Sequence, residues 1–149
     1  MKVIALILTI SILYSNKIGA QKQDEEGVRS AINQFFEGMK NSDTVLIRTV
    51  IFTGARLETV LRDKKGNTVV RTENFDEFLK MIAKPHTEVY DERISFSSIL
   101  VDDNLATAWT PYQFYIGDKF SHQGVNAFQL VKNSDGKWMI LSIIDTRRK

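Results

Sequence analysis

Three short, turn-rich connectors divide the second half of the chain into long segments of strand character. The connectors are residues 102–104, 117–118 and 133–136, built from Asp, Asn, Ser and Gly, which favour turns. The segments that they separate are residues 87–101, 105–116, 119–132 and 137–148. Because such short connectors allow only antiparallel pairing of consecutive strands, the pattern predicts an antiparallel meander of four strands.

Helical patterns dominate the first half of the chain. Apolar residues at helical spacing form one stripe, Val28, Ala31, Ile32, Phe35, Phe36 and Met39, which predicts an amphipathic helix. Its acidic residues 24–26 suit the positive end of a helix dipole. Residues 44–51 predict a second, shorter helix. Residues 74–84 predict a third, with Asn74 as N-cap, Glu77 completing a capping box and Pro85 ending the helix.

A β-hairpin is predicted between the second and third helices. Residues 55–63 and 68–73 have strand character, and the turn-forming sequence KKGN lies between them. Helices followed by a long antiparallel sheet indicate the α+β class. Pro111 predicts a bulge or an edge, and Gly124 predicts a kink or a close backbone approach. Both are typical of a strongly curved sheet, so we expect a cone with helices packed on the sheet and one open end.

The first 20 residues have the three-part layout of a secretory signal peptide. Lys2 precedes an apolar run from Val3 to Tyr14, and small residues follow at Gly19 and Ala20. The run is shorter than the roughly 20 residues that span a bilayer. We therefore expect cleavage after Ala20, which leaves one domain over residues 21–149. An uncleaved membrane anchor is the alternative.

Composition narrows the classes of function. Without Lys2 and Lys17 the basic residues fall from 20 to 18, which balances the 18 acidic residues. Such a chain lacks the basic stripe of a nucleic-acid-binding protein. The chain contains no cysteine and so forms no disulfide. For an exported protein, periplasmic or secreted, this favours a bacterial periplasm over a eukaryotic extracellular setting. We expect no membrane contact after cleavage.

Several short motifs carry a resemblance to a known superfamily. They are Ala108-Trp109, Tyr112-x-Phe114, Ser121-His122-x-Gly124, Phe128-x-Leu130, Trp138 and Thr146-Arg147-Arg148. With the hairpin region they resemble the nuclear transport factor 2-like superfamily, the cone-shaped α+β fold shared with ketosteroid isomerase. The closer similarity is to its small secreted bacterial branch, called SnoaL-like or putative lumazine-binding. The resemblance implies a pocket protein, commonly a homodimer, without implying one function.

Strand alternation predicts which side chains face the cone interior. His122, Asn126 and Phe128 share the less polar face of their strand. In the neighbouring strand Thr110, Tyr112 and Phe114 are grouped. In the last strand one face holds Trp138, Ile140, Ser142, Ile144 and Thr146. An apolar cavity with a few convergent polar groups is the usual form of a small-molecule site.

These faces supply candidate ligand-binding residues. The set comprises His122, Asn126, Tyr112, Phe114, Phe128, Trp109 and Arg56, with Thr146 as a further polar group. The aromatic members could stack on a flat ring, so we expect a small, flat, apolar or aromatic ligand. Each also has a structural interpretation, such as a buried histidine bonded to a carbonyl, sheet packing, or a surface ion pair of Arg56 with Glu58 or another charge.

Two other functions remain open. An isomerase or cyclase could use His122 as a base and Tyr112 as an oxyanion donor. Asp145 is another candidate base, although strand alternation places its side chain on the opposite face of the strand from Thr146. The resemblance implies an aspartate where this chain has Asn126, and an amide cannot accept that proton. Alternatively, the protein is a dimeric interaction module with a filled cavity.

The apolar odd positions of the last strand, Met139, Leu141 and Ile143, would form the dimer surface of such a module. Two histidines without metal-ligand spacing predict no metal site. No phosphate-binding loop is present, and we expect no cofactor.

Overall fold

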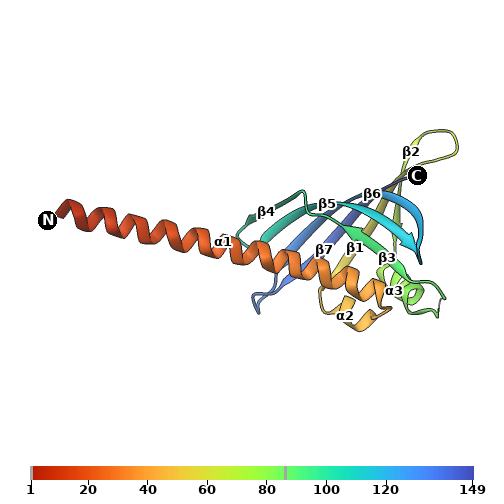
Figure 1. Cartoon of the computed structure of the whole chain (residues 1–149), viewed down its shortest axis with the longest axis horizontal. Coiled ribbons are helices and arrows are strands. Elements are labelled where there is room, and N and C mark those ends of the chain that lie inside the picture. Colours follow the sequence, from red (N-terminus) through yellow and green to blue (C-terminus); the bar gives the residue numbers. More distant parts are fainter. Residues whose placement is uncertain (1, 86) are drawn as a thin grey trace.

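The computed structural model describes residues 2–85 and 87–149, with side chains from residue 19 onward. Three helices precede or interrupt the first strands: α1 (Lys2–Lys40), α2 (Thr44–Arg48) and α3 (Phe75–Ala83). The strands are β1 (Ile51–Arg62), β2 (Thr68–Glu73), β3 (Tyr90–Ile94), β4 (Ser98–Asp102), β5 (Leu105–Ile116), β6 (Lys119–Lys132) and β7 (Trp138–Arg148). Figure 1 shows α1 running along one face of a curved sheet, which confirms the α+β class.

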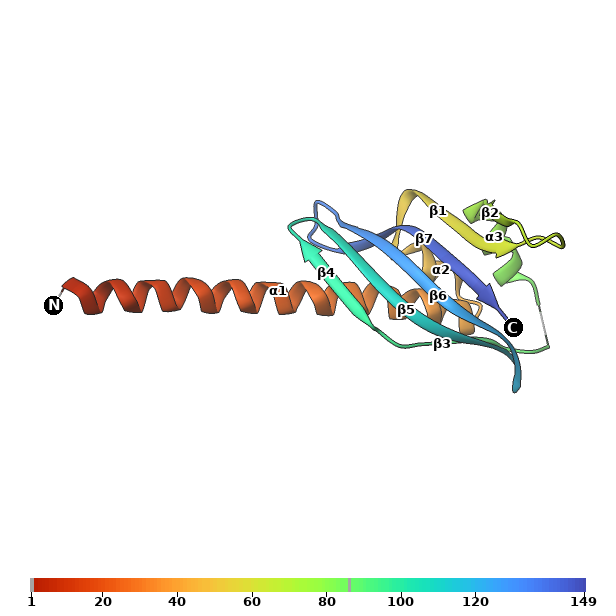
Figure 2. The ribbon, with the colours of Figure 1, turned by 90° about the horizontal axis from the view of Figure 1, so that it is seen from above.

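The sheet has the strand order β2-β1-β7-β6-β5-β3, and β4 also pairs with β5. The hairpin of β1 and β2 and the β5–β6–β7 meander are antiparallel, as predicted. The pair of β1 with β7 is parallel, so the sheet is mixed. Seen from above, its strands cross α1 obliquely (Figure 2).

The segment expected to form one strand over residues 87–101 forms two. β3 pairs with the second half of β5, and β4 pairs with the first half. Ser95 N donates to the carbonyl oxygen of Pro111 at 3.0 Å. Because the nitrogen and the oxygen of one strand residue face the same neighbour, the missing N–H of Pro111 lies where this ladder is interrupted. The β5–β6 register continues through Pro111 without a shift. The irregularity next to Pro111 therefore lies in the segment between β3 and β4, and not in β5.

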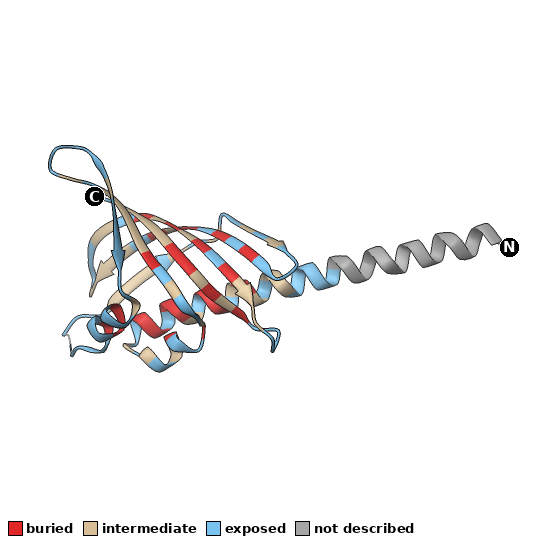
Figure 3. Cartoon of the chain, turned by 180° about the vertical axis from the view of Figure 1, so that it is seen from behind, coloured by how far each residue is buried: buried red, intermediate tan, exposed pale blue. Residues whose placement is uncertain are grey.

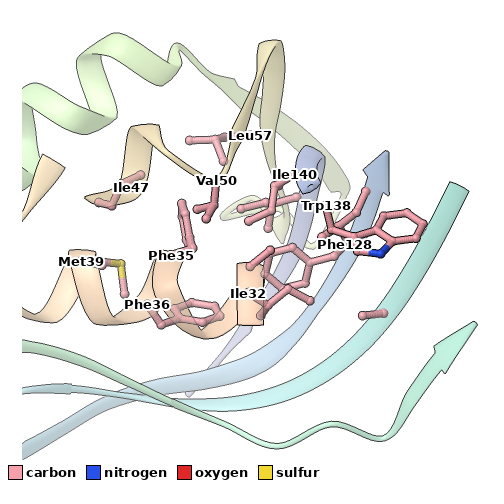
Figure 4. Packing of buried hydrophobic residues seen from close by; sticks show 14 of the residues in the cluster. Ile32, Phe35, Phe36, Met39, Ile47, Val50, Leu57, Phe128, Trp138 and Ile140 are labelled. Carbon is pink, nitrogen blue, oxygen red and sulfur yellow. The ribbon is translucent and has the colours of Figure 1, made fainter. Parts of the chain in front are cut away.

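The inner face of the sheet packs on the predicted stripe of α1. Every stripe residue from Val28 to Met39 is buried, and Figure 4 shows Ile32 and Phe36 beside Phe128 of the sheet. The Phe36 and Phe128 rings meet edge to face at 6.0 Å. Burial is concentrated between helix and sheet (Figure 3).

The beginning of α1 differs from the prediction. The helix begins at Lys2, so residues 24–26 lie inside it and not in its first turn. Asp24 instead accepts a hydrogen bond from Trp138 Nε1 at 3.3 Å and forms an ion pair with Lys132. The signal-peptide prediction depends on the apolar side chains from Val3 to Tyr14, which are not among the side chains described. Among residues with described side chains, no helix is long and apolar enough to cross a membrane.

The two short helices begin at capping side chains. Asp43 accepts from Leu46 N at 2.9 Å. Asn74 accepts from the backbone of Asp76 and Glu77 at 2.9 and 3.1 Å, as predicted for an N-cap. The return half of the capping box is not formed, because Glu77 accepts from Lys80 at 2.7 Å instead.

Candidate ligand-binding site

A cavity of about 420 Å³ lies between the inner face of the sheet and the helices. Its apolar walls come from α1 (Phe35, Phe36 and Met39) and α3 (Phe78, Met81 and Ile82). Its polar groups come from the strands. The volume lies within the range of small-molecule sites, roughly 300–1,000 Å³. The cone is therefore hollow at this end and is not filled by its own side chains.

A bulge in β7 decides which polar groups reach the cavity. Gln129 is opposite Ser142, but the next β6 residue, Leu130, is opposite Ile140. The extra residue, Leu141, reverses the alternation. Asp145 and Arg147 therefore line the cavity. The predicted face is wrong from Ser142 onward, since Ser142, Ile144 and Thr146 lie on the outer side and Asp145 on the inner one.

The Tyr112 side chain extends from β5 over Gly124 of β6 and reaches β7. The two residues are direct partners in the β5–β6 ladder, and a Cβ added at Gly124 would lie 1.7 Å from the carbonyl oxygen of Thr146 and 2.6 Å from the Tyr112 ring. The close backbone approach predicted at Gly124 is confirmed. The Tyr112 hydroxyl reaches Thr146 O at 3.0 Å and Asp145 Oδ2 at 3.1 Å. Its one proton is engaged by these acceptors, so Tyr112 positions Asp145.

Asp145 has a second partner on its own strand. Arg147 Nε donates to Asp145 Oδ2 at 3.1 Å, and the carboxylate is 13% exposed. Burial, and then the carboxylates of Asp145 and Glu92, raise the pKa of Tyr112. The phenol therefore stays protonated and remains a donor at neutral pH.

Glu92 is a cavity carboxyl group that the sequence reasoning missed. It lies on β3 opposite Phe114, and Asn126 Nδ2 donates to its Oε1 at 2.8 Å. Burial raises the pKa of Glu92 to about 7. The Asn126 bond and Arg147 oppose this rise, and Asp145 adds to it. Its place between Tyr90 and Ile94 on an apolar face was the available signal.

His122 lies at the cavity wall, as predicted. Its ring is 5.0 Å from the Phe114 ring and meets the Tyr112 ring edge to face at 5.8 Å. Its Nδ1 is 3.1 Å from Ser121 Oγ. Burial and then Arg147 lower its pKa, with Asp145 opposing them. The imidazole is therefore neutral at pH 7.

The other predicted site residues divide into two groups. Tyr112, Phe114 and Asn126 line the cavity with His122. Trp109 does not, because it projects from the outer face of β5 and is 50% exposed. Phe128 faces inward but is fully buried in the core against α1. Arg56 lies outside this cavity.

Arg56 lines a separate hollow of about 750 Å³, formed by α2, the start of β1 and the start of α3. The irregular stretch of β1 between Ile51 and Arg56 explains this placement. No ion pair of Arg56, with Glu58 or with another charge, is among those of the described residues. Within the same part of the chain, no group of three or more His, Asp or Glu side chains is arranged to hold a metal ion.

Similar structures share the fold. An NTF2-like protein of unknown function from Shewanella baltica matches with a TM-score of 0.63 and 16% identity, over 85% of this chain and 95% of that one. One from Silicibacter pomeroyi matches with a TM-score of 0.62 and 17% identity, over 86% and 98%. An NTF2-like protein with a cystatin-like fold from Novosphingobium aromaticivorans matches with a TM-score of 0.67 and 10% identity, over 86% and 84%.

Sequence comparison extends this result from fold to family. No curated protein matches the chain. A family profile described as putative lumazine-binding matches residues 23–144, which include the helical stripe of α1 and all strands except the end of β7. The chain therefore belongs to the putative lumazine-binding family and has the NTF2-like, cystatin-like cone fold.

Proposed function

We propose that this protein is exported to the periplasm or the cell exterior and binds a small, flat, partly apolar molecule in the cone cavity. The observation that carries the proposal is the hollow of about 420 Å³, in which apolar helix residues face polar groups from the strands of the sheet. Phe114, with Tyr90 at 5.9 Å and His122 at 5.0 Å, presents ring surfaces for a planar ligand.

Blocking the cavity should abolish the binding of a neutral apolar dye. Met81 lines the cavity and is 41% exposed, so Met81→Trp can occupy the opening without overpacking the core. We expect Nile red to bind the wild type and to lose at least about tenfold in affinity in Met81→Trp, because the indole removes the space that the dye fills. Fluorescence titration measures this.

Val45→Trp is the matched control. Val45 on α2 is 74% exposed and does not line the cavity, so the same kind of substitution there should leave the affinity unchanged. Equal binding by both variants and the wild type would place the dye elsewhere and refute the cavity site.

Export is supported by the N-terminal sequence alone. Native mass spectrometry of the protein purified from its source tests export and ligand together. We expect a chain beginning at Gln21 with a retained small molecule. A mass that includes residues 1–20 would contradict cleavage.

A proton-transfer enzyme is the second candidate, and Glu92 favours it. A cavity carboxyl group with a pKa of about 7 is suited to act as a general base near neutral pH. The Tyr112 hydroxyl, the predicted donor to a substrate oxyanion, already donates to Asp145 and Thr146. It is therefore not available to stabilise that oxyanion. This activity would appear as exchange of C–H hydrogens of the ligand for deuterium in D₂O. The exchange should occur with the wild type and be lost in Glu92→Gln.

We further propose a homodimer formed through the outer face of the sheet. Leu100, Leu105 and Trp109 on β4 and β5 are 50–65% exposed on this face, and exposed apolar clusters mark contact sites. The surface predicted from Met139, Leu141 and Ile143 is wrong, since Ile143 is buried and lines the cavity.

Trp109→Lys should weaken this dimer at least about tenfold, because it places a charge in the centre of an apolar contact. Light scattering over a concentration series measures the change, with Val45→Lys as the exposed control. A wild type that is monomeric at all concentrations would exclude the dimer.

A further inference from the structure

Glu92 has one carboxylate oxygen available to a ligand. Oε1 accepts from Asn126 at 2.8 Å, and no donor to Oε2 is found among the described residues. The side chain lines the cavity on β3, at the wall opposite α3 and the hairpin of β1 and β2. Since Asn126 is 4% exposed and holds this geometry, the available oxygen is placed by a rigid sheet contact and not by a mobile surface side chain.

The charged groups around Glu92 are mostly acidic. β2 contributes Glu73, and β7 contributes Asp145 and Arg147. Glu58 of β1 borders the cavity but pairs with Ile144, so its side chain lies on the outer face. β5 and β6 contribute Tyr112 and His122, both uncharged at neutral pH for the reasons given above. The cavity-lining residues of α1 and α3 are apolar. Three carboxyl groups, those of Glu73, Glu92 and Asp145, therefore face one guanidinium.

The single cation is already engaged. Arg147 Nε is bonded to Asp145, and these two charges offset each other. The Arg147 side chain is 53% exposed, so water screens what remains of its charge. A ligand carboxylate or phosphate that approached Arg147 would also approach Glu92 and Asp145, which repel it. The unbalanced charge deep in the cavity is thus negative.

We infer that the cavity selects flat ligands that carry a positively charged nitrogen, such as an aromatic ring bearing a protonated amine, with Glu92 Oε2 as the acceptor of its N–H. This inference rests on the proposed small-molecule site and names its ligand class. An ionic hydrogen bond of this kind is stronger than a neutral one, and its strength increases where water is excluded by apolar walls.

Three indoles of similar shape separate charge from fit. At neutral pH tryptamine is a cation, 3-ethylindole is neutral and indole-3-propionate is an anion. We expect tryptamine to bind at least about tenfold tighter than 3-ethylindole, and indole-3-propionate to bind most weakly, because complementary charge is favoured and like charge is disfavoured in a partly buried site. Isothermal titration calorimetry measures all three affinities.

Glu92→Gln tests the named residue. Glutamine keeps the acceptor for Asn126 but removes the charge, so tryptamine should lose about tenfold in affinity while 3-ethylindole changes less than about twofold. Asp135→Asn is the matched control. It removes one negative charge from an exposed turn whose hydrogen bonds are made by Asn133 and the backbone. It should leave all three affinities unchanged.

The pH dependence supplies a readout that lost folding would not reproduce. Tryptamine affinity should rise between about pH 6 and about pH 8 as Glu92 ionises, and this rise should be absent in Glu92→Gln. If indole-3-propionate binds as tightly as tryptamine, or Glu92→Gln keeps the preference, the inference is wrong. If Nile red binds the cavity but tryptamine does not, the ligand class is wrong while the proposed site stands. Failure of Nile red to distinguish Met81→Trp removes the site itself.

Discussion

Gly124→Ala is expected to destabilise the protein by about 4 kcal/mol or more, at the high end for a single substitution. The added Cβ would lie 1.7 Å from the carbonyl oxygen of Thr146 and 2.6 Å from the Tyr112 ring. A flexible side chain could move aside, but the nearest atom belongs to the backbone of β7. The two central strands must separate, which breaks both their ladder and the Tyr112 bonds to Asp145 and Thr146. Denaturant unfolding measures the change.

Gly54→Ala is the control, because it makes the same substitution in the same sheet. No atom lies within 4 Å of the added Cβ, but Gly54 has φ +82. Only backbone strain is expected, about 1 kcal/mol. Removing the Tyr112 ring should not rescue Gly124→Ala, since the Thr146 carbonyl remains. Equal losses of stability at the two glycines would show that the close approach at Gly124 is not tight.

Glu92→Gln is expected to stabilise the protein by about 3 kcal/mol above pH 7 and to have little effect below pH 4.5. The pKa of Glu92 is about 7 in the folded protein, against an ordinary value of 4.5. Between these values the native state keeps a proton that the unfolded chain has released. The free energy of unfolding therefore falls as pH rises through this window and stays reduced above it. Glutamine has no proton to lose, so its variant escapes the penalty.

The difference in the free energy of unfolding between wild type and Glu92→Gln, followed over pH, reports on the titration of Glu92 alone. His122 acts in the opposite direction, because its lowered pKa makes stability fall as pH decreases through the neutral range. Asp91, held by Lys40 and Arg93, has a lowered pKa and loses its contribution only in stronger acid. Both effects are present in wild type and variant and cancel in the difference. A difference that does not change between about pH 5 and about pH 8 would show that Glu92 titrates normally.

Local patterns predicted those parts of the fold that depend on local interactions. The stripe from Val28 to Met39 is buried along α1, Asn74 caps α3, and the short connectors produce the β5–β6–β7 meander. Period and turn chemistry act over a few residues, so one sequence is enough to detect them. The interior positions of Asn126 and Phe128 followed from the same alternation.

Predictions failed where a neighbouring strand determined the geometry. The parallel pairing of β1 with β7 joins residues far apart in the sequence, such as Ile51 and Ile140, and no local signal indicates it. Trp109 faces outward because the β5 register continues through Pro111, while the adjacent strand absorbs the irregularity. The separation of β3 from β4 has the same origin.

The amino-acid sequence alone determined the α+β class, the stripe of α1, the order of the last strands and the position, Gly124, of a kink or close backbone approach. Only the tertiary structure decided which polar groups meet in the cavity. One extra residue in β7, Leu141, turns Asp145 and Arg147 inward, and the pairing of β3 with β5 brings Glu92 to Asn126. A site assembled across strands depends on register, and the side-chain period of two means that a single-residue shift reverses every position beyond it.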